Sequence, residues 1–420
     1  LIMSKDGGET WSPVKGYDDL GLFKNTLKWP TWTEHVVRAA TTAEYGSQNG
    51  VATIHIQGGK VYVGTSVQAE GNMVVADVGS DDFTVLSKDL PTNSYPSRIN
   101  VDADGNLLLC YIGGLTFNGT GGGIYRYNPT DQTVTDISPS GNSFSACMTQ
   151  PDNANALIAT TCGVWSTQSW SKNDSPYGDW LYRSMYGGKT WTKMANSPGG
   201  RAAITQLEDG TYRFFKSDSS SDQSAGVSYS DDFGQTWSSC TGIPSSYGSK
   251  PTNMFVDPDQ PNLVYAYVTY YNSSWGYSKP AAELSDAQYN LCVSTDYGKT
   301  FTSTTVCMYD QCDSAGRIAY LGDGKLALAA GWYGAYRVSD SGKTIEKMEN
   351  VSYCKTMGYG APEKEGGMNT LFMYGKPDES DPEGIYRSTD GGDTWVCINT
   401  QKLYGGTGNG NFLVGDMNEF

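Results

Sequence analysis

The sequence predicts an all-β protein built from repeated units of four short strands. Its 420 residues include 51 glycines and 29 tyrosines and only 18% charged residues, which is typical of a chain rich in strands and tight turns. An eight-residue motif also recurs along the chain, and the segments between its copies read as short strands separated by turn residues. These two observations together favour a repeat architecture.

The recurring motif has the form Ser-x-Asp-x-Gly-x-Thr-Trp and is called the box below. Its copies are Ser4–Trp11, Ser184–Trp191, Ser230–Trp237, Ser294–Phe301, Val338–Ile345 (after Arg337, with Val338 replacing the leading Ser) and Ser388–Trp395. The Asp position falls at residues 6, 186, 232, 296, 340 and 390, with Tyr186 replacing the Asp in the second copy. A period of about 50 residues with four strands per unit predicts a β-propeller, whose units are blades arranged in a ring.

The box has a local structural explanation. Its Asp can accept backbone N–H bonds within the turn, its Gly permits a positive φ, and its Trp begins the next strand with a large apolar surface. Carboxylates repeated around a ring cannot all serve one active site. We therefore predict a structural role in turns for the box aspartates, Asp6, Asp232, Asp296, Asp340 and Asp390.

The whole chain, 1–420, is predicted to form a single propeller domain of seven to eight four-stranded blades. The full blades are expected at about 51–87, 97–138, 143–195, 201–243, 252–306, 316–350 and 354–398. Residues 1–14 read as a hairpin of two outer strands and 410–420 as an inner strand, so the two ends could close the ring as a composite blade. The alternatives are seven blades with frayed ends, or a truncated chain.

Composition excludes several kinds of partner. The net charge is −16 and the chain has only 29 Lys and Arg, which argues against nucleic acid and against an anionic membrane surface. No run of 18 apolar residues predicts a transmembrane helix. With nine cysteines, no CxxC and two histidines, no metal site and no cofactor are expected, and Cys307 and Cys312 are spaced for a local disulfide.

One face of the predicted ring carries the long connections. With the strands of a blade named A to D from the inside outwards, the A–B and C–D turns share one face, the box face. The B–C and D–A connections share the other, the loop face. Aromatic rings on long connections suit stacking on the C–H faces of sugars, so a polysaccharide or oligosaccharide is the expected partner, although each ring could instead cover its own loop. The predicted sugar-binding residues are Trp29, Trp32, Trp165, Trp170, Trp275, Trp332 and Tyr333.

Four stretches resemble the xyloglucan-cleaving glycoside hydrolases of family 74, which are Asp-box (BNR-repeat) propellers. They are 384–418, 354–376, 156–194 and 122–139, and they cover the chain in patches. The resemblance implies a secreted, extracellular enzyme that hydrolyses a plant β-glucan such as xyloglucan. Family members usually contain two propellers, each with a catalytic Asp in a D-x-G-G setting at the end of a B strand. This chain has the length of one propeller, and neither motif is found at an equivalent place. A sialidase is less favoured, because no arginine triad stands out on the B–C connections.

Inverting hydrolysis needs an acid and a base carboxylate about 6.5–9.5 Å apart. The catalytic candidates on the loop face are Glu34, Glu70 and Asp218, with Glu283 as a further carboxylate, and each could instead be a solvated loop residue. One alternative is a glycan-binding propeller without catalysis, or a module of a larger multi-modular enzyme. The other is a polysaccharide lyase, for which His35, Arg38 and Tyr45 share one loop.

Overall fold

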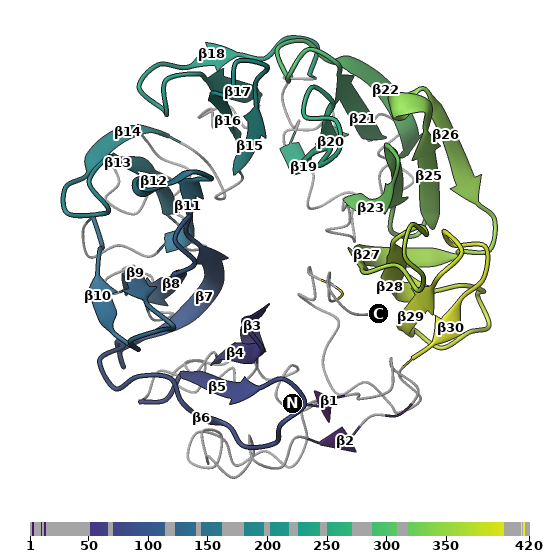
Figure 1. Ribbon diagram of the computed structural model, residues 1–420. Coiled ribbons are helices and arrows are strands. Elements are labelled where there is room, and N and C mark those ends of the chain that lie inside the picture. The colour runs from purple at the N-terminus through teal and green to yellow at the C-terminus, as the bar shows by residue number, and fades with distance from the viewer. Residues whose placement is uncertain are drawn as a thin grey trace, which may run out of the picture.

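The computed structural model is an all-β ring of sheets, which confirms the predicted fold class (Figure 1). It describes residues 2–3, 10, 12–13, 51–65, 70–113, 122–139, 144–161, 180–196, 202–217, 226–243, 250–270, 288–308, 318–398, 413 and 415. Within these residues the sheets are seven of four strands and one of two, and the only helical element is a 3-10 turn, η4 (Asp340–Gly342).

Consecutive antiparallel strands form each blade, with the first strand innermost. Blade 1 contains β3 (Val51–Gln57), β4 (Lys60–Thr65), β5 (Met73–Asp77) and β6 (Thr84–Val85). Blade 2 contains β7 (Ser94–Val101), β8 (Leu107–Gly113), β9 (Gly122–Tyr127) and β10 (Val134–Asp136). Blade 3 contains β11 (Phe144–Gln150), β12 (Asn153–Thr161), β13 (Trp180–Ser184) and β14 (Thr192–Asn196). Blade 4 contains β15 (Ala202–Gln206), β16 (Tyr212–Ser217), β17 (Val227–Ser230) and β18 (Ser238–Ser239).

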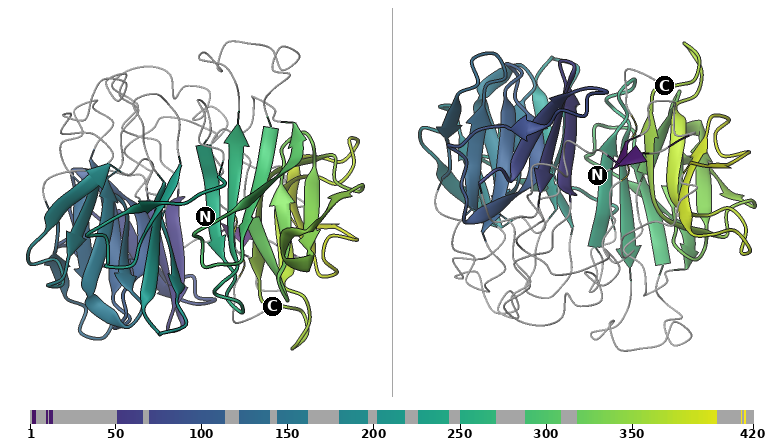
Figure 2. Two further views of the ribbon diagram at one scale, coloured as in Figure 1. Left: turned by 90° about the horizontal axis from the view of Figure 1, so that it is seen from above. Right: turned by 90° about the horizontal axis from the view of Figure 1, so that it is seen from below.

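The remaining blades repeat this order. Blade 5 contains β19 (Lys250–Val256), β20 (Val264–Tyr270), β21 (Gln288–Ser294) and β22 (Thr302–Met308). Blade 6 contains β23 (Ile318–Gly322), β24 (Lys325–Ala329), β25 (Ala335–Ser339) and β26 (Thr344–Met348). Blade 7 contains β27 (Tyr353–Gly360), β28 (Thr370–Lys376), β29 (Gly384–Ser388) and β30 (Val396–Cys397). In each blade the strands run between the two faces of the ring (Figure 2).

The two-stranded sheet pairs β1 (Ile2–Met3) with β2 (Ser12–Pro13). Figure 1 places it between blades 7 and 1, and Met3 packs against the apolar cluster of blade 1 that contains Val63 and Phe83. Near the other end of the chain, the Gly415 N–H donates a 2.9 Å hydrogen bond to the Tyr359 carbonyl of β27. The rest of the expected composite blade lies outside the described residues.

Most hydrophobic clusters lie between blades. One joins Tyr62 and Met73 of blade 1 to Leu107 and Leu109 of blade 2, and all four side chains are buried. Equivalent clusters bridge the other described neighbours from blade 2 through blade 7. The blades therefore bury most of their apolar residues against neighbouring blades, and only blade 1 has a described cluster made largely of its own residues.

The box forms the C–D turn of its blade. In blade 4 the Ser230 hydroxyl accepts the Gly234 N–H at 2.7 Å and donates to Asp232 at 2.8 Å. The Asp232 carboxylate in turn accepts the Thr236 N–H at 2.8 Å. The boxes of Asp296 and Asp390 repeat these bonds. The sequence therefore builds the turn from its own side chains, as an Asx-turn does.

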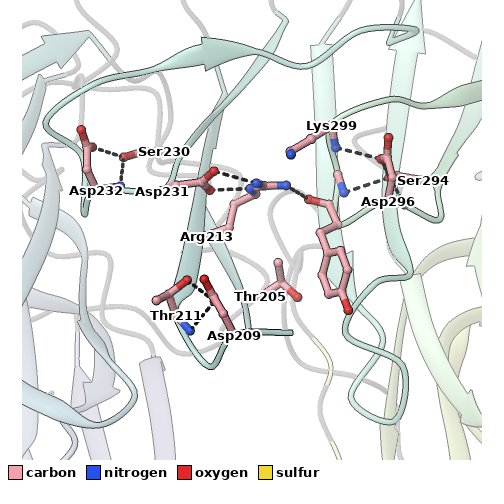
Figure 3. A network of polar contacts seen from close by, with 12 residues as sticks. Thr205, Asp209, Thr211, Arg213, Ser230, Asp231, Asp232, Ser294, Asp296 and Lys299 are labelled. Atoms are coloured by element: carbon pink, nitrogen blue, oxygen red, sulfur yellow. Dashed lines mark hydrogen bonds and ion pairs between the residues drawn. The ribbon is translucent and has the colours of Figure 1, made fainter. Parts of the chain in front are cut away.

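The fourth residue of the box is held by an arginine of the preceding blade. Arg126 Nη1 donates to the Gly187 carbonyl at 3.1 Å, and Arg337 Nε donates to the Gly391 carbonyl at 2.7 Å. Arg213 Nη1 donates to the Tyr297 carbonyl at 2.9 Å while its other nitrogens bind Asp231 (Figure 3). These contacts between blades were not predicted from the sequence.

Candidate functional site

The described part of the loop face belongs mainly to blades 1, 6 and 7. Most predicted site residues therefore lie outside the described residues, namely Trp29, Trp32, Glu34, Trp165, Trp170, Asp218, Trp275 and the box residue Asp6. The same holds for His35, Arg38, Tyr45 and Glu283. Trp332, Tyr333 and Glu70 are described, so the geometry of the candidate site is built from them.

Trp332 and Tyr333 lie on a tight B–C turn that joins β24 to β25. The Gly334 N–H donates to the Gly331 carbonyl at 3.0 Å, which closes the turn. Gly331 and Cys354 of blade 7 exchange two further backbone bonds of 2.8 and 2.9 Å. A Cβ at Gly334 would lie 2.1 Å from the Val351 carbonyl oxygen, so only glycine fits there. The two aromatic residues thus stand on a turn fixed to the neighbouring blade.

The Trp332 ring is supported from below and exposed above. Its centroid lies 4.3 Å from that of Tyr353, with the ring planes tilted by 34°. Trp332 nevertheless keeps 55% of its surface exposed, and Tyr333 keeps 37%, while Tyr353 is buried. An indole held in place by a second ring loses little conformational freedom when a ligand stacks on it. The turn therefore presents a rigid aromatic platform to solvent.

A carboxylate that the sequence analysis did not single out is connected to this platform through Tyr374, which lies near the Tyr353 that supports Trp332. Glu383 ends the B–C connection of blade 7 and accepts a hydrogen bond from the Tyr374 hydroxyl. Burial, and then this hydrogen bond, raise the pKa of Tyr374 well above its ordinary value, and the proximity of Tyr353 adds to the effect. The only sequence signal was the position of Glu383 directly before a strand, in a connection rich in acidic residues.

Glu70 lies on the loop face of blade 1, as predicted, but it is a solvated carboxylate. Its side chain is 59% exposed, and its ion-pair partner, Lys88 Nζ, is 3.9 Å away and 84% exposed. Exposed ion pairs of this kind contribute little to the stability of the fold. Blade 7 and the β1–β2 hairpin separate Glu70 from Trp332 around the ring, so the structure does not bring these two predicted residues together (Figure 1).

The box aspartates lie on the opposite face, where their own turns occupy them. Burial acts to raise the pKa of Asp232, but hydrogen bonds from Thr236 and Ser230 outweigh it and hold that pKa below its ordinary value. Asp296 and Asp390 show the same balance. In the box of blade 6 the Thr344 hydroxyl donates to Asp340 at 2.9 Å. Carboxylates committed to turns in this way are poor acids or bases for a substrate.

Cysteines and metal ligands add little to the site. The partner of Cys307 in the expected local disulfide, Cys312, lies outside the described residues. Burial raises the pKa of Cys307 to about 12, and its thiol hydrogen-bonds with Tyr336. The described residues contain no group of three or more His, Cys, Asp or Glu placed to hold a metal ion. They also contain no helix with the length and apolarity that a membrane crossing requires.

Two curated relatives match this chain in sequence, whereas no protein-family model does. A xyloglucanase from a Paenibacillus species is 23% identical over 424 residues, which cover 95% of this chain and 36% of the relative. An oligoxyloglucan-reducing end-specific xyloglucanase from Emericella nidulans is 26% identical over 180 residues, covering 42% of this chain and 20% of the relative. The chain therefore spans well under half the length of the relatives it matches. The resemblance predicted from the sequence is confirmed.

Solved structures of that family also align with the chain. The GH74 enzyme of Niastella koreensis aligns over 100% of this chain at 20% identity with a TM-score of 0.32. The GH74 xyloglucanase of Xanthomonas campestris aligns over 100% of this chain at 17% identity with a TM-score of 0.34.

Proposed function

We propose that this chain is one propeller of a glycoside hydrolase that acts on xyloglucan or a similar plant β-glucan. The proposal is supported by its sequence similarity to a xyloglucanase along 95% of its length. Because the chain spans 36% of that relative, the complete active site would include parts contributed by another module. A cell-wall polymer is too large to enter a cell, so the protein would act outside it.

The observation that carries this proposal in the structure is the platform of Trp332 and Tyr333. Sugar rings present C–H groups on one face and hydroxyls at their edges, so they bind to a flat aromatic surface with polar neighbours. Trp332 supplies the surface, and Glu383, which binds Tyr374 on the same face of the ring, supplies a hydrogen-bond acceptor. The net charge of −16 favours a neutral glucan over a uronate polymer, which the protein would repel.

The test is to truncate the platform with Trp332→Ala. Binding of xyloglucan oligosaccharides should weaken by about 1–3 kcal/mol, by analogy with the loss of aromatic stacking on a nucleic-acid base. Titration calorimetry measures this directly, with mixed-linkage glucan and polygalacturonate as comparison ligands. The matched control is Tyr186→Ala, which removes a ring that is 67% exposed on the box face. Unchanged binding in a folded Trp332→Ala variant, or binding to polygalacturonate alone, would reject the proposal.

A glycan-binding propeller without catalysis is the second candidate, because the chain lacks the D-x-G-G setting of the family's catalytic aspartates. Release of reducing sugar from xyloglucan, measured beside absorbance from unsaturated uronate products, separates the possibilities. Reducing sugar without that absorbance indicates a hydrolase. Binding without either product indicates a binding module.

A further inference from the structure

A hollow between blades 1 and 2 opens on the box side of the ring, away from the aromatic platform. It consists of two adjoining parts, each of about 430 Å³, which share Gln57 and Pro129. This size falls within the range of about 300–1,000 Å³ that is usual for small-molecule sites. The part between the blades is lined by Tyr62, Val75, Leu86, Tyr127 and Gln132, among others.

The sequence of blade 2 differs from that of several other blades at a position next to the hollow. In other blades the last box residue packs against the preceding blade, as Trp191 does by donating from Nε1 to the Ile137 carbonyl at 2.7 Å. The cross-strand register shows which residue takes this place in blade 2. In blade 3, Arg183 pairs with Thr192, so the first box residue, Ser184, lies opposite the last, Trp191. In blade 2 the equivalent pair is Tyr127 and Val134. Valine therefore stands where blades 3, 4 and 7 carry tryptophan, and this smaller side chain packs beside Tyr62 and Tyr127 of the hollow.

Two tyrosines line this space, and their hydroxyls make no hydrogen bond within the described part of the chain. Tyr62 and Tyr127 are only 3% and 5% exposed, and their rings meet edge to face at 6.3 Å. Burial raises the pKa of both groups, so each stays a neutral hydroxyl that can donate and accept. The rings are buried but neither hydroxyl is fully buried, so each can form a hydrogen bond with a ligand that enters the hollow.

The rim adds polar groups and selects against anions. Lys60 forms a 2.6 Å ion pair with Asp77, and both side chains remain substantially exposed. Asp82 adds a further negative charge to the lining, while Gln132 offers an uncharged amide. One Lys against two Asp leaves the rim net negative, so phosphate or uronate groups would be repelled. A neutral polyol ring can place its C–H groups on Tyr62 and Leu86 and its hydroxyls on the rim.

We propose that this hollow is a second saccharide-binding site, which takes a terminal sugar ring of a neutral oligosaccharide on the face opposite the aromatic platform. The site itself follows from the hollow, the tyrosine hydroxyls and the rim. The choice of a β-glucan as its ligand rests on the proposed function. A second site would let the protein bind one end of a polysaccharide while another part of the same polysaccharide occupies the loop face.

The test introduces at position 134 the tryptophan that blades 3, 4 and 7 carry there, so that its indole occupies space beside Tyr62 and Tyr127. Val134→Trp is made in the Trp332→Ala background, so that the remaining affinity reports on the hollow. Titration with xyloglucan oligosaccharides should show the residual affinity falling on the order of tenfold. Ile345→Trp is the matched control, because Ile345 takes the same box position in blade 6. If Val134→Trp does not fold by circular dichroism, the double variant Lys60→Met/Asp82→Asn replaces it, with the same expectation.

The outcomes are distinguishable. Residual affinity that is unchanged by a folded Val134→Trp variant overturns the second site. Complete loss of binding by Trp332→Ala alone overturns it as well. Manno- and galacto-oligosaccharides are titrated in parallel. If the protein ignores xyloglucan but binds one of these neutral sugars in a way that Val134→Trp abolishes, the hollow is a saccharide site and the proposed function is wrong. Binding of neither class overturns both.

Discussion

Two buried aspartates in equivalent positions show how single residues differ between blades. Asp102 and Asp257 each follow strand A of their blade and are 5% and 0% exposed. Asp102 lies 2.9 Å from Nε of Arg126, the residue before the first box position. In blade 5 that position is Val293, so Asp257 has no arginine there. Its Oδ1 accepts the backbone N–H groups of residues 259 and 260 and the Tyr320 hydroxyl, while Oδ2 has no partner among the described residues.

The two aspartates should therefore respond differently to loss of charge. Asp102→Asn leaves Arg126 without its counter-ion in a largely buried place and should lower the free energy of unfolding by about 3–5 kcal/mol. Asp257→Asn keeps an acceptor for the turn and removes a charge that no cation balances, so its effect should stay within about 1 kcal/mol. Urea unfolding at pH 7 measures both variants. Equal costs for the two would contradict this account.

The box is the element whose chemistry the sequence reveals most fully. Its Ser, Asp and Thr bind one another and the turn backbone, so the bonds are local and can be read from residue order. The arginines that hold the fourth box residue lie in the preceding blade, 54 to 84 residues away. No local pattern reports such a contact, because it depends on how consecutive blades are placed in the ring.

Removing one box carboxylate tests the role assigned to the turn. Asp390→Ala should cost about 1 kcal/mol of stability at pH 7, by analogy with the loss of a helix-capping bond, and leave oligosaccharide affinity unchanged. Burial acts to raise the pKa of Asp390, but bonds from Thr394 and Ser388 hold it below its ordinary value. The stabilisation is therefore present above the unfolded pKa of about 4 and is lost as the pH falls through the lower folded pKa.

Unfolding of Asp390→Ala and of the unchanged protein is compared by urea titration at several pH values between 7 and 2.5. The difference in stability should shrink towards acid pH. A difference that stays constant with pH, or a large loss of glycan affinity in the folded variant, would show that Asp390 acts in another way.

Across the whole molecule, the number and order of blades could be predicted because every blade repeats the same alternation of strands and turns. The functional face could be predicted less completely. Its aromatic residues occur on long connections of irregular sequence, and only the short turn of Trp332 and Tyr333 has a described geometry. Val134 was visible in the sequence, but whether neighbours would fill the space beside it depends on packing that no local pattern specifies.

The shared clusters between blades predict cooperative unfolding. Leu109, between blades 1 and 2, and Leu328, between blades 5 and 6, are both fully buried. Truncation of either to Ala should cost about 2–5 kcal/mol. Because each face of a blade depends on its neighbour, both variants should lower the midpoint of one common transition, followed by fluorescence and circular dichroism. Separate transitions for the two halves of the ring would contradict this prediction.

The arginine contacts also suggest an order in which the blades can assemble during synthesis. In each observed pair the arginine precedes in the chain the turn that it holds, as Arg126 precedes Gly187 and Arg337 precedes Gly391. A ribosome makes the chain from its N-terminus. Each of these turns is therefore synthesised after the arginine that donates a hydrogen bond to its carbonyl. Blades can then be added one at a time to a growing arc, and the joining of the last blade to the first is the step that must wait for the complete chain.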